Sequence, residues 1–205
     1  MVTFKGSHVK SLICSAALAL ILFPSMGSAQ DYEAGLAASK AGDYATALRE
    51  FAPLAEQGDV KAQKELGAMY ALGWGVPQDF AEAAKWGRRA AEQGDAAAQG
   101  DLGFMYSVGQ GVPHDYAEAV KWWRLAAEQA YPLWMDNLAS AYQNGKGVPQ
   151  DYVTAYVWFS IAVANGNSFA KVPWDKLTVI MTPADISEAQ RRATVCMASN
   201  YRECD

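Results

Sequence analysis

The sequence predicts an all-α protein, a solenoid of about four two-helix repeats closed by C-terminal capping helices. Two motifs recur every 36 residues along the chain. A five-residue pattern of the type Asp-aromatic-Ala-x-Ala begins at Asp43, Asp79 and Asp115, and it returns at Asp151 with valine in place of the first alanine. A Gly-x-Gly-Val-Pro pattern begins at Gly73, Gly109 and Gly145. A fixed period of this size is typical of units that bury their apolar face only by stacking on their neighbours.

The third unit illustrates how each repeat is built. Asp95 can cap a first helix whose apolar positions follow the spacing of one helical face. These positions are Ala98, Leu102, Met105 and Tyr106. The turn at 109–113 ends this helix, because its glycines permit left-handed backbone and its proline cannot continue a helix. Asp115 then caps a second helix, expected from Tyr116 to Gln129.

The same registers return in neighbouring units, which indicates that the layers share one core. Leucines, tyrosines and tryptophans recur at the 36-residue spacing as Leu66, Leu102 and Leu138, as Tyr70, Tyr106 and Tyr142, and as Trp86, Trp122 and Trp158. Alanines between them allow paired helices to approach closely, and the large aromatic side chains fill the space between layers.

These motifs closely resemble the Sel-1-like repeat, a relative of the tetratricopeptide repeat. The resemblance rests on Ala-x-x-x-Leu-Gly-x-x-Tyr, Gly-x-Gly-Val-Pro-x-Asp-Tyr and Ala-x-x-Trp-x-x-x-Ala-Ala, and it covers about residues 59–165. It implies a right-handed α-α superhelical solenoid and a role as an adaptor or scaffold. Fold alone does not fix function. Some exported relatives carry a disulfide in each repeat, but the repeats of this chain contain no cysteine.

The repeats and the resemblance together predict the domain organisation. We expect a signal peptide at 1–29, an atypical tetratricopeptide-like unit at 30–58, Sel-1-like repeats at 59–94, 95–130 and 131–166, and capping helices at 167–205. Within the last segment, Pro173 is expected to interrupt a short helix between Ser168 and Met181. Thr182 to Asp185 then gives a helix-start signature. The inward face of that final helix is expected to be Ile186, Ala189, Ala193 and Met197.

The N-terminus has the features of an export signal. Lys5, His8 and Lys10 precede an apolar run at 12–23, and small residues end at Ala29. The run has 12 residues, whereas a membrane span needs about 20. We therefore expect cleavage after Ala29 and a periplasmic or secreted protein with no stable membrane span. An uncleaved anchor is the alternative.

Charge argues against two classes of partner. The formal net charge is −5, and loss of 1–29 removes Lys5 and Lys10 but no acid, which makes it −7. An acidic chain without a basic cluster is a poor ligand for nucleic acid or anionic lipid. Five basic residues could nevertheless form a stripe along stacked second helices, or be solvated pairs with neighbouring acids: Lys85, Arg88, Arg89, Lys121 and Arg124.

Two cysteines follow the signal segment, Cys196 and Cys204. Export to an oxidising compartment favours a disulfide between them. Eight positions on one straight helix span about 12 Å, too far for the bond, so pairing requires a chain reversal near 198–200. Two free thiols on a frayed tail are the alternative.

The sequence offers little catalytic chemistry. His114, the one histidine that follows the signal segment, lies at a variable turn position, and a single histidine without Cys-x-x-Cys predicts no zinc site. Ser168 and Lys171 match the Ser-x-x-Lys spacing of penicillin-interacting enzymes, but the companion motifs are absent and Ser168 also fits a helix cap. We therefore expect no cofactor and no catalytic site, with a cell-wall enzyme or ligand binder as the alternative.

The expected function is binding of another protein or a peptide segment in a groove lined by the first helices. Gln63, Gln99 and Asn137 would supply amides to a peptide backbone, and Phe104 would anchor a side chain. These residues could equally be ordinary surface. A third possibility is a structural protein that assembles end to end through its terminal helices.

Overall fold

The computed structural model describes residues 28–202 and Cys204. The described chain is helical throughout. The elements are α1 (Ser28–Lys40), α2 (Tyr44–Glu56), α3 (Val60–Leu72), α4 (Phe80–Glu92), α5 (Ala96–Val108), α6 (Tyr116–Ala127), α7 (Pro132–Asn144), α8 (Tyr152–Ala164), the 3-10 turn η1 (Ser168–Ala170), α9 (Lys171–Ile180) and α10 (Pro183–Ala198). The predicted export segment 1–29 lies outside these residues except for its last two, with which α1 begins.

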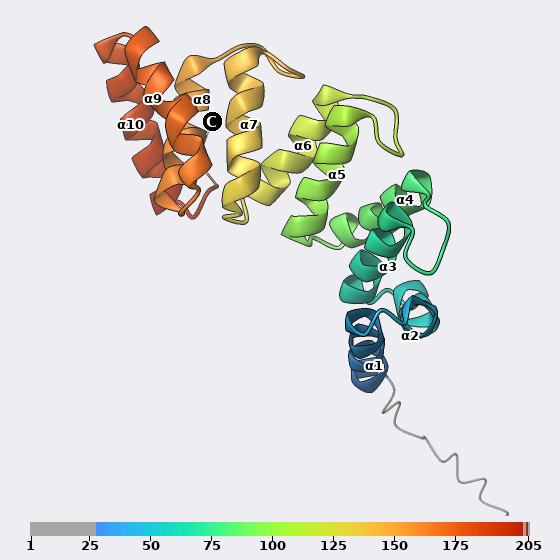
Figure 1. Ribbon diagram of the computed structural model, residues 1–205. Helices are drawn as coiled ribbons and strands as arrows, with labels where there is room; N and C mark the ends of the chain where they lie inside the picture. The colour runs from blue at the N-terminus through green and yellow to red at the C-terminus, as the bar shows by residue number, and fades with distance from the viewer. Residues whose placement is uncertain (1–27, 203, 205) are drawn as a thin grey trace, which may run out of the picture.

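The predicted fold class is confirmed. Consecutive helices pack as the pairs α1–α2, α3–α4, α5–α6 and α7–α8, and each pair packs on the next. Figure 1 shows the pairs following one another from α1 at one end to α9 and α10 at the other. Both capping helices pack on α8, the last helix of the fourth pair.

Aspartate caps set where the helices begin. The carboxylates of Asp59 and Asp95 accept from the amides of Ala62 and Ala98 at 2.8 Å, which fixes the starts of α3 and α5. At the second helices, Asp79 and Asp115 each accept from two backbone amides in the first turn. Because the first amides of a helix have no partner within it, each cap satisfies groups that would otherwise be orphaned.

The two glycines of the Gly-x-Gly-Val-Pro turn have different roles. The first, as at Gly109 (φ 69°), ends its helix in the left-handed conformation and donates its amide to Met105 O. The second, as at Gly111 (φ 73°), also has positive φ, and it lies so close to Phe80 O that a Cβ would collide with backbone. Gly75 and Gly147 make the same approach to the preceding second helix. The second glycine therefore ties each turn to the repeat before it.

The buried apolar residues fall into three clusters of unequal size. The largest extends from α6 through α10 and contains Trp123, Trp134 and Trp158. A smaller one joins α2, α3 and α4 around Phe51 and Trp86. The third lies at the junction of α4 and α5 and consists of Ala90, Ala91, Ala98 and Leu102. The repeat is therefore regular in backbone but not in the size of its core side chains.

The capping helices differ from the prediction at two residues. Pro173 does not interrupt a helix, because it lies in the first turn of α9, where the missing N–H has no intrahelical acceptor. Met197 was expected to face inward, but it is 43% exposed, and Cys196 is buried in its place. The helix start at Thr182 is confirmed, since its side chain accepts from the amide of Asp185.

The structure joins Cys196 to Cys204 in a disulfide, with Cα atoms 4.4 Å apart. The chain reverses between them, because α10 ends at Ala198 and both Asn200 (φ 55°) and Tyr201 (φ 65°) adopt left-handed backbone. Arg192 donates to Thr154 Oγ1 on α8 at 3.1 Å and to Cys204 O at 3.4 Å. The C-terminal tail is thereby held against the last repeat.

Candidate functional site

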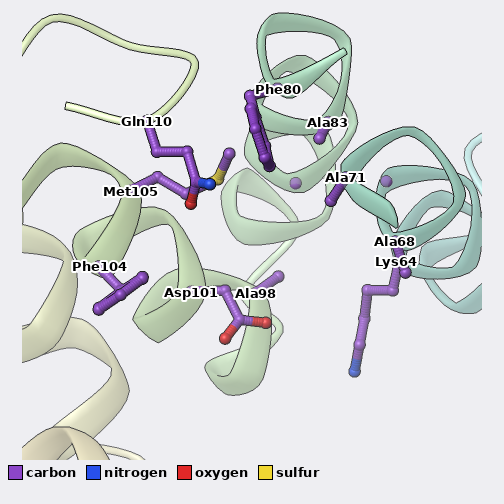
Figure 2. Close-up of a pocket in the computed structure, with 12 residues that line it drawn as sticks. Lys64, Ala68, Ala71, Phe80, Ala83, Ala98, Asp101, Phe104, Met105 and Gln110 are labelled. Atoms are coloured by element: carbon purple, nitrogen blue, oxygen red, sulfur yellow. The ribbon is translucent and has the colours of Figure 1, made fainter. Parts of the chain in front are cut away.

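A pocket of about 250 Å³ opens between α3, α4 and α5. Half of its lining residues are glycine or alanine: Gly67, Ala68, Ala71, Ala83, Gly87 and Ala98. Phe80, Phe104 and Met105 add larger apolar surface, and Lys64, Asp101 and Gln110 complete the lining. Figure 2 shows these side chains converging from the three helices and the following turn. We refer to it as the α3–α5 pocket.

The pocket exists because one repeat has a glycine where the others have an aromatic ring. At the 36-residue spacing, Gly87 corresponds to Phe51, Trp123 and Phe159. All three aromatic side chains are buried, with at most 4% exposure. A Cβ built on Gly87 meets nothing within 4 Å. The space that a ring fills in the other repeats is therefore open at Gly87.

In the next repeat, the equivalent space is closed by two indole rings. Trp123 replaces Gly87 and packs on Gly103, whose Cβ would lie 2.6 Å from the ring. Trp134 replaces Ala98, and its ring packs directly on Gly100. Gly100 and Gly103 correspond to the pocket residues Lys64 and Gly67. Rings from the chain itself thus occupy this position in the third repeat.

In the first repeat, aromatic side chains also close the equivalent space. Phe51 packs on Gly35, whose Cβ would lie 2.7 Å from the ring, and the centroids of Phe51 and Tyr32 are 5.5 Å apart. The turn between α1 and α2 is shorter than the turn between α3 and α4, so Tyr32 and Gly35 take the places of the pocket residues Lys64 and Gly67. The α3–α5 pocket is therefore flanked on both sides by repeats in which the same place is filled.

Two charged residues, Lys64 and Asp101, line the pocket, and they differ in whether they have a direct partner. The Lys64 ammonium lies 3.1 Å from Asp95 Oδ2, so its charge is largely compensated. Within the described chain, the Asp101 carboxylate has no hydrogen bond or ion pair of its own. Crowding by the neighbouring helices raises the pKa of Asp101, with a further increase from Asp95 and an opposing effect from Lys64. Asp101 is thus the charged group of the pocket that has no direct partner among the described residues, and Lys64 compensates its charge only in part.

Gln63 and Gln99, which we expected to present amides to a peptide, are buried. Their side chains are 3% and 5% exposed. Gln63 Nε2 donates to Ala55 O at 3.0 Å, and Gln99 Nε2 donates to Ala91 O at 3.2 Å. The side-chain carbonyl of each accepts at 2.8 Å from a glutamine at the end of the second helix of the same pair, Gln93 after α4 and Gln129 after α6. Both residues connect successive helices, and the expectation that they face a groove was wrong.

The structure separates the other two expected site residues. Phe104 is 46% exposed and lines the α3–α5 pocket, where an anchor was predicted. Asn137 lies on α7, does not line the pocket, and donates to Leu133 O of its own helix at 3.0 Å. Gly87, Ala98 and Asp101 also line the pocket, but none of them was predicted as a site residue. The departure of Gly87 from the aromatic register was the available signal for the pocket.

The alternative chemistry considered above finds little geometric support. Lys171 Nζ contacts both carboxylate oxygens of Asp175, at 2.8 and 3.0 Å, rather than the hydroxyl of Ser168. Over residues 28–202 and Cys204, no group of three or more His, Cys, Asp or Glu side chains is placed to hold a metal ion. In the same residues, every helix is too short or too polar to cross a bilayer.

The basic side chains of the second helices are engaged within the protein. Lys85 and Lys121 pair with Glu82 and Glu118 on their own helices. Arg89 pairs with Glu56 of the preceding repeat at 3.0 Å. Arg88 and Arg124 donate to the hydroxyls of Tyr106 and Tyr142 in the following repeat. These residues therefore act as surface pairs and connections between repeats.

Comparison with known proteins agrees with this architecture. The family model described as Sel1 repeat matches residues 60–95, 96–131 and 135–167. A search of curated proteins gave no match. Among solved structures, the chain is similar to c5321, a protective antigen of uropathogenic Escherichia coli strains with an SLR fold. The two are 41% identical with a TM-score of 0.68, over 71% of this chain and 32% of that one.

The chain is also similar to a Sel1 repeat protein from Oxalobacter formigenes, with 32% identity and a TM-score of 0.66, over 70% of this chain and 59% of the other. It thus spans about a third and about three fifths of the lengths of these two relatives. The three family matches together cover just over half of the residues. Register, helix pairing and motif agree, and the protein belongs to the Sel1 repeat family.

Proposed function

We propose that this protein is an exported, non-catalytic scaffold that binds a segment of another protein at the α3–α5 pocket. Sel1 repeat proteins generally mediate protein–protein interaction. The observation that carries the proposal is an open apolar pocket in a solenoid whose other equivalent positions are filled. Leu72, Phe104 and Val108 are each at least 46% exposed on α3 and α5 and extend the apolar surface.

Two features support action outside the cytoplasm. Residues 1–29 have the charge and apolar pattern of a secretory signal. The Cys196–Cys204 disulfide suits an oxidising compartment, because cytosolic thiols are normally kept reduced. N-terminal sequencing of the protein from a periplasmic or culture fraction should begin at Gln30. Recovery only of the full-length chain in the membrane fraction would instead support an uncleaved anchor.

Site-specific photo-crosslinking tests the binding site in cells. A photoreactive amino acid at Phe104 should give one dominant crosslinked partner, identified by mass spectrometry. The matched control is Leu125, a similarly exposed apolar residue (43%) on α6, away from the pocket. Crosslinks at 104 that are absent at 125 support the proposal. The same products at both positions, or none at either, would contradict it.

A second candidate function is end-to-end self-assembly, and one feature of α9 favours it. Phe169 of η1 precedes α9, and Val172, Val179 and Ile180 lie along α9; each of the four is at least 58% exposed. Contiguous exposed apolar surface often marks an interface. Light scattering over a concentration range tests this function with Val179→Asp as the comparison. A mass that stays monomeric at all concentrations excludes it.

A further inference from the structure

We propose that the α3–α5 pocket receives a single aromatic side chain of the partner segment, and that Asp101 selects a basic residue beside that ring. This inference rests on the proposed function and specifies the chemistry of its partner. Three observations carry it: the size of the pocket, the side chains that fill the same place in neighbouring repeats, and the charge of Asp101, which has no direct partner among the described residues.

The size of the pocket restricts what it can hold. Its volume is about 250 Å³. Sites for drug-sized ligands generally have roughly 300–1,000 Å³, whereas an apolar cavity of about 150 Å³ already binds benzene. The pocket is therefore small for a cofactor and large enough for one aromatic ring, which favours one side chain of a peptide over a free small molecule.

The neighbouring repeats show which chemistry fits this place. Phe51 fills the equivalent space one repeat earlier, and Trp123 with Trp134 fills it one repeat later. In the pocket itself, Gly87 and Ala98 omit those rings, while α3, α5 and α7 have the same length of 13 residues. Phe80, Phe104 and Met105 remain to contact an incoming ring through aromatic and sulfur–aromatic interactions. The pocket therefore has room for an aromatic ring from the partner.

The charges around the pocket favour a basic residue next to that ring. Lys64 is already paired with Asp95, while Asp101 is exposed to solvent and unpaired within the described residues. A cation on the partner would compensate Asp101, and a carboxylate would be repelled by both Asp95 and Asp101. At the corresponding position, the next repeat has the neutral Asn137, and the preceding repeat has Glu65, which does not line the pocket.

Two short probes that differ only in charge test the proposal on the whole protein. The probes are acetyl-Trp-Arg-amide and acetyl-Trp-Glu-amide, titrated while the methyl resonances of Ala83 and Ala98 are followed by NMR. The arginine probe should shift these resonances with a millimolar dissociation constant, since one ring supplies most of the contact. The glutamate probe should bind about threefold more weakly, as expected for a partly exposed ion pair.

Two variants separate the contribution of the ring from that of the charge. Gly87→Phe restores the ring found in the other repeats and should weaken binding of both probes at least about tenfold, because it occupies the space by steric exclusion. Asp101→Asn should keep ring binding but abolish the difference between the probes. Glu65→Gln is the matched control, since Glu65 holds the same register one repeat earlier and does not line the pocket.

Phe104→Ala provides a second variant with little risk to folding, because Phe104 is half exposed. It should weaken both probes about threefold or more, whereas Leu125→Ala should have no effect. Equal binding to the original protein and to Gly87→Phe would overturn the inference. So would the absence of shifts at Ala83 and Ala98 with either probe.

Failure of this inference can be distinguished from failure of the proposed function. A partner crosslinked at position 104 that still binds Gly87→Phe with unchanged affinity would retain the scaffold function and exclude the ring. Loss of that partner with Gly87→Phe, together with a charge preference that depends on Asp101, would support both. Absence of any specific crosslink at position 104 contradicts the scaffold function independently of the probes.

Discussion

At the scale of single residues, two glycines in the same turn are required for different reasons. Gly109 needs left-handed backbone, and its Cβ would approach His114 of the same turn, at 3.1 Å from Cβ and 3.4 Å from N. Gly111 needs left-handed backbone and also the absence of a Cβ, because Phe80 O and the amide of Ala81 occupy that space. The contact with His114 at 3.1 Å needs only a small shift within the turn, whereas the overlap with Phe80 O at 1.9 Å would require α4 to move.

The first prediction compares these two positions. Gly109→Ala should destabilise the protein by about 1 kcal/mol, the usual cost of a left-handed conformation for a residue with a Cβ. Gly111→Ala should cost about 3 kcal/mol, because overpacking against backbone adds to that cost. Urea denaturation followed by circular dichroism measures the difference. Equal losses would show that the second glycine is not held by Phe80.

The carboxyl of Asp136 illustrates a residue whose environment opposes its charge. Its Oδ1 is buried on α7 and lacks a hydrogen-bond partner among the described residues. Burial raises the pKa of Asp136 above its ordinary value. The unfolded chain therefore releases this proton at a lower pH than the folded protein. The associated stability is fully present below the unfolded pKa and is lost as pH rises through the folded pKa.

The second prediction follows from that sign. Asp136→Asn removes the charge that burial disfavours, so the variant should melt at a higher temperature than the original protein at neutral pH. The difference should vanish below about pH 3, where Asp136 is protonated in both states. Thermal melts across this pH range measure it. A variant that is less stable at neutral pH would show that the ionised carboxylate has a partner.

At the scale of helices, the sequence predicted how elements begin and end better than it predicted which side chains are exposed. Aspartates and glycines act locally, so the 36-residue spacing was enough to place caps and turns. Gln63 and Gln99 were misplaced because their acceptors, Ala55 O and Ala91 O, belong to the end of the preceding helix. The spacing of apolar residues within one helix contains no information about that neighbour.

The pocket was only partly predictable for a similar reason. The glycine at position 87 is visible in the sequence as an exception to an aromatic register, and Phe104 was correctly chosen as a side chain that the structure leaves exposed there. Whether α3 and α5 close over a missing ring depends on how tightly the flanking repeats hold them apart. That outcome is a property of packed helices, and periodicity does not determine it.

The third prediction concerns the terminal helix α10. Its buried face is short, consisting of Ala189, Ala193 and Cys196, so the disulfide to Cys204 should contribute substantially to its attachment. Reduction, or Cys204→Ser, should destabilise the protein by roughly 2–3 kcal/mol, the chain-entropy value for so short a loop. Differential scanning calorimetry with and without reductant measures this change. A melting curve unaffected by reductant would indicate that α10 is held by packing on α8 alone.

At the scale of the whole molecule, the distribution of core side chains divides the solenoid. The cluster from α6 to α10 contains most of the large buried rings, whereas the fully buried residues at the junction of α4 and α5 are three alanines and one leucine, against which Val60, Tyr106 and Trp122 pack. Stability in a solenoid is approximately a sum over repeats and their interfaces. A junction whose fully buried side chains are small, between two regions with larger buried rings, should therefore lower the cooperativity of unfolding.

The fourth prediction is that the two regions open separately. Backbone amides of α7 and α8 should exchange with solvent most slowly, while amides of α1 to α4 should exchange through an opening of lower free energy. Hydrogen exchange monitored by mass spectrometry resolves the two groups. Gly87→Phe, which adds a ring next to this junction, should slow exchange in α3 and α4. Uniform protection along the chain would contradict this division.

The alanine junction also affects the curvature of the solenoid. The fully buried side chains here are small and make fewer dispersion contacts than buried tryptophans, although Tyr106 and Trp122 pack against them. We therefore expect the first two helix pairs to tilt on the remainder with less resistance at this junction than at those with fully buried rings. The α3–α5 pocket lies at the same junction. A ring bound in the pocket would hold the two halves of the solenoid at one angle. Occupation of this small pocket would then determine the curvature of the whole molecule.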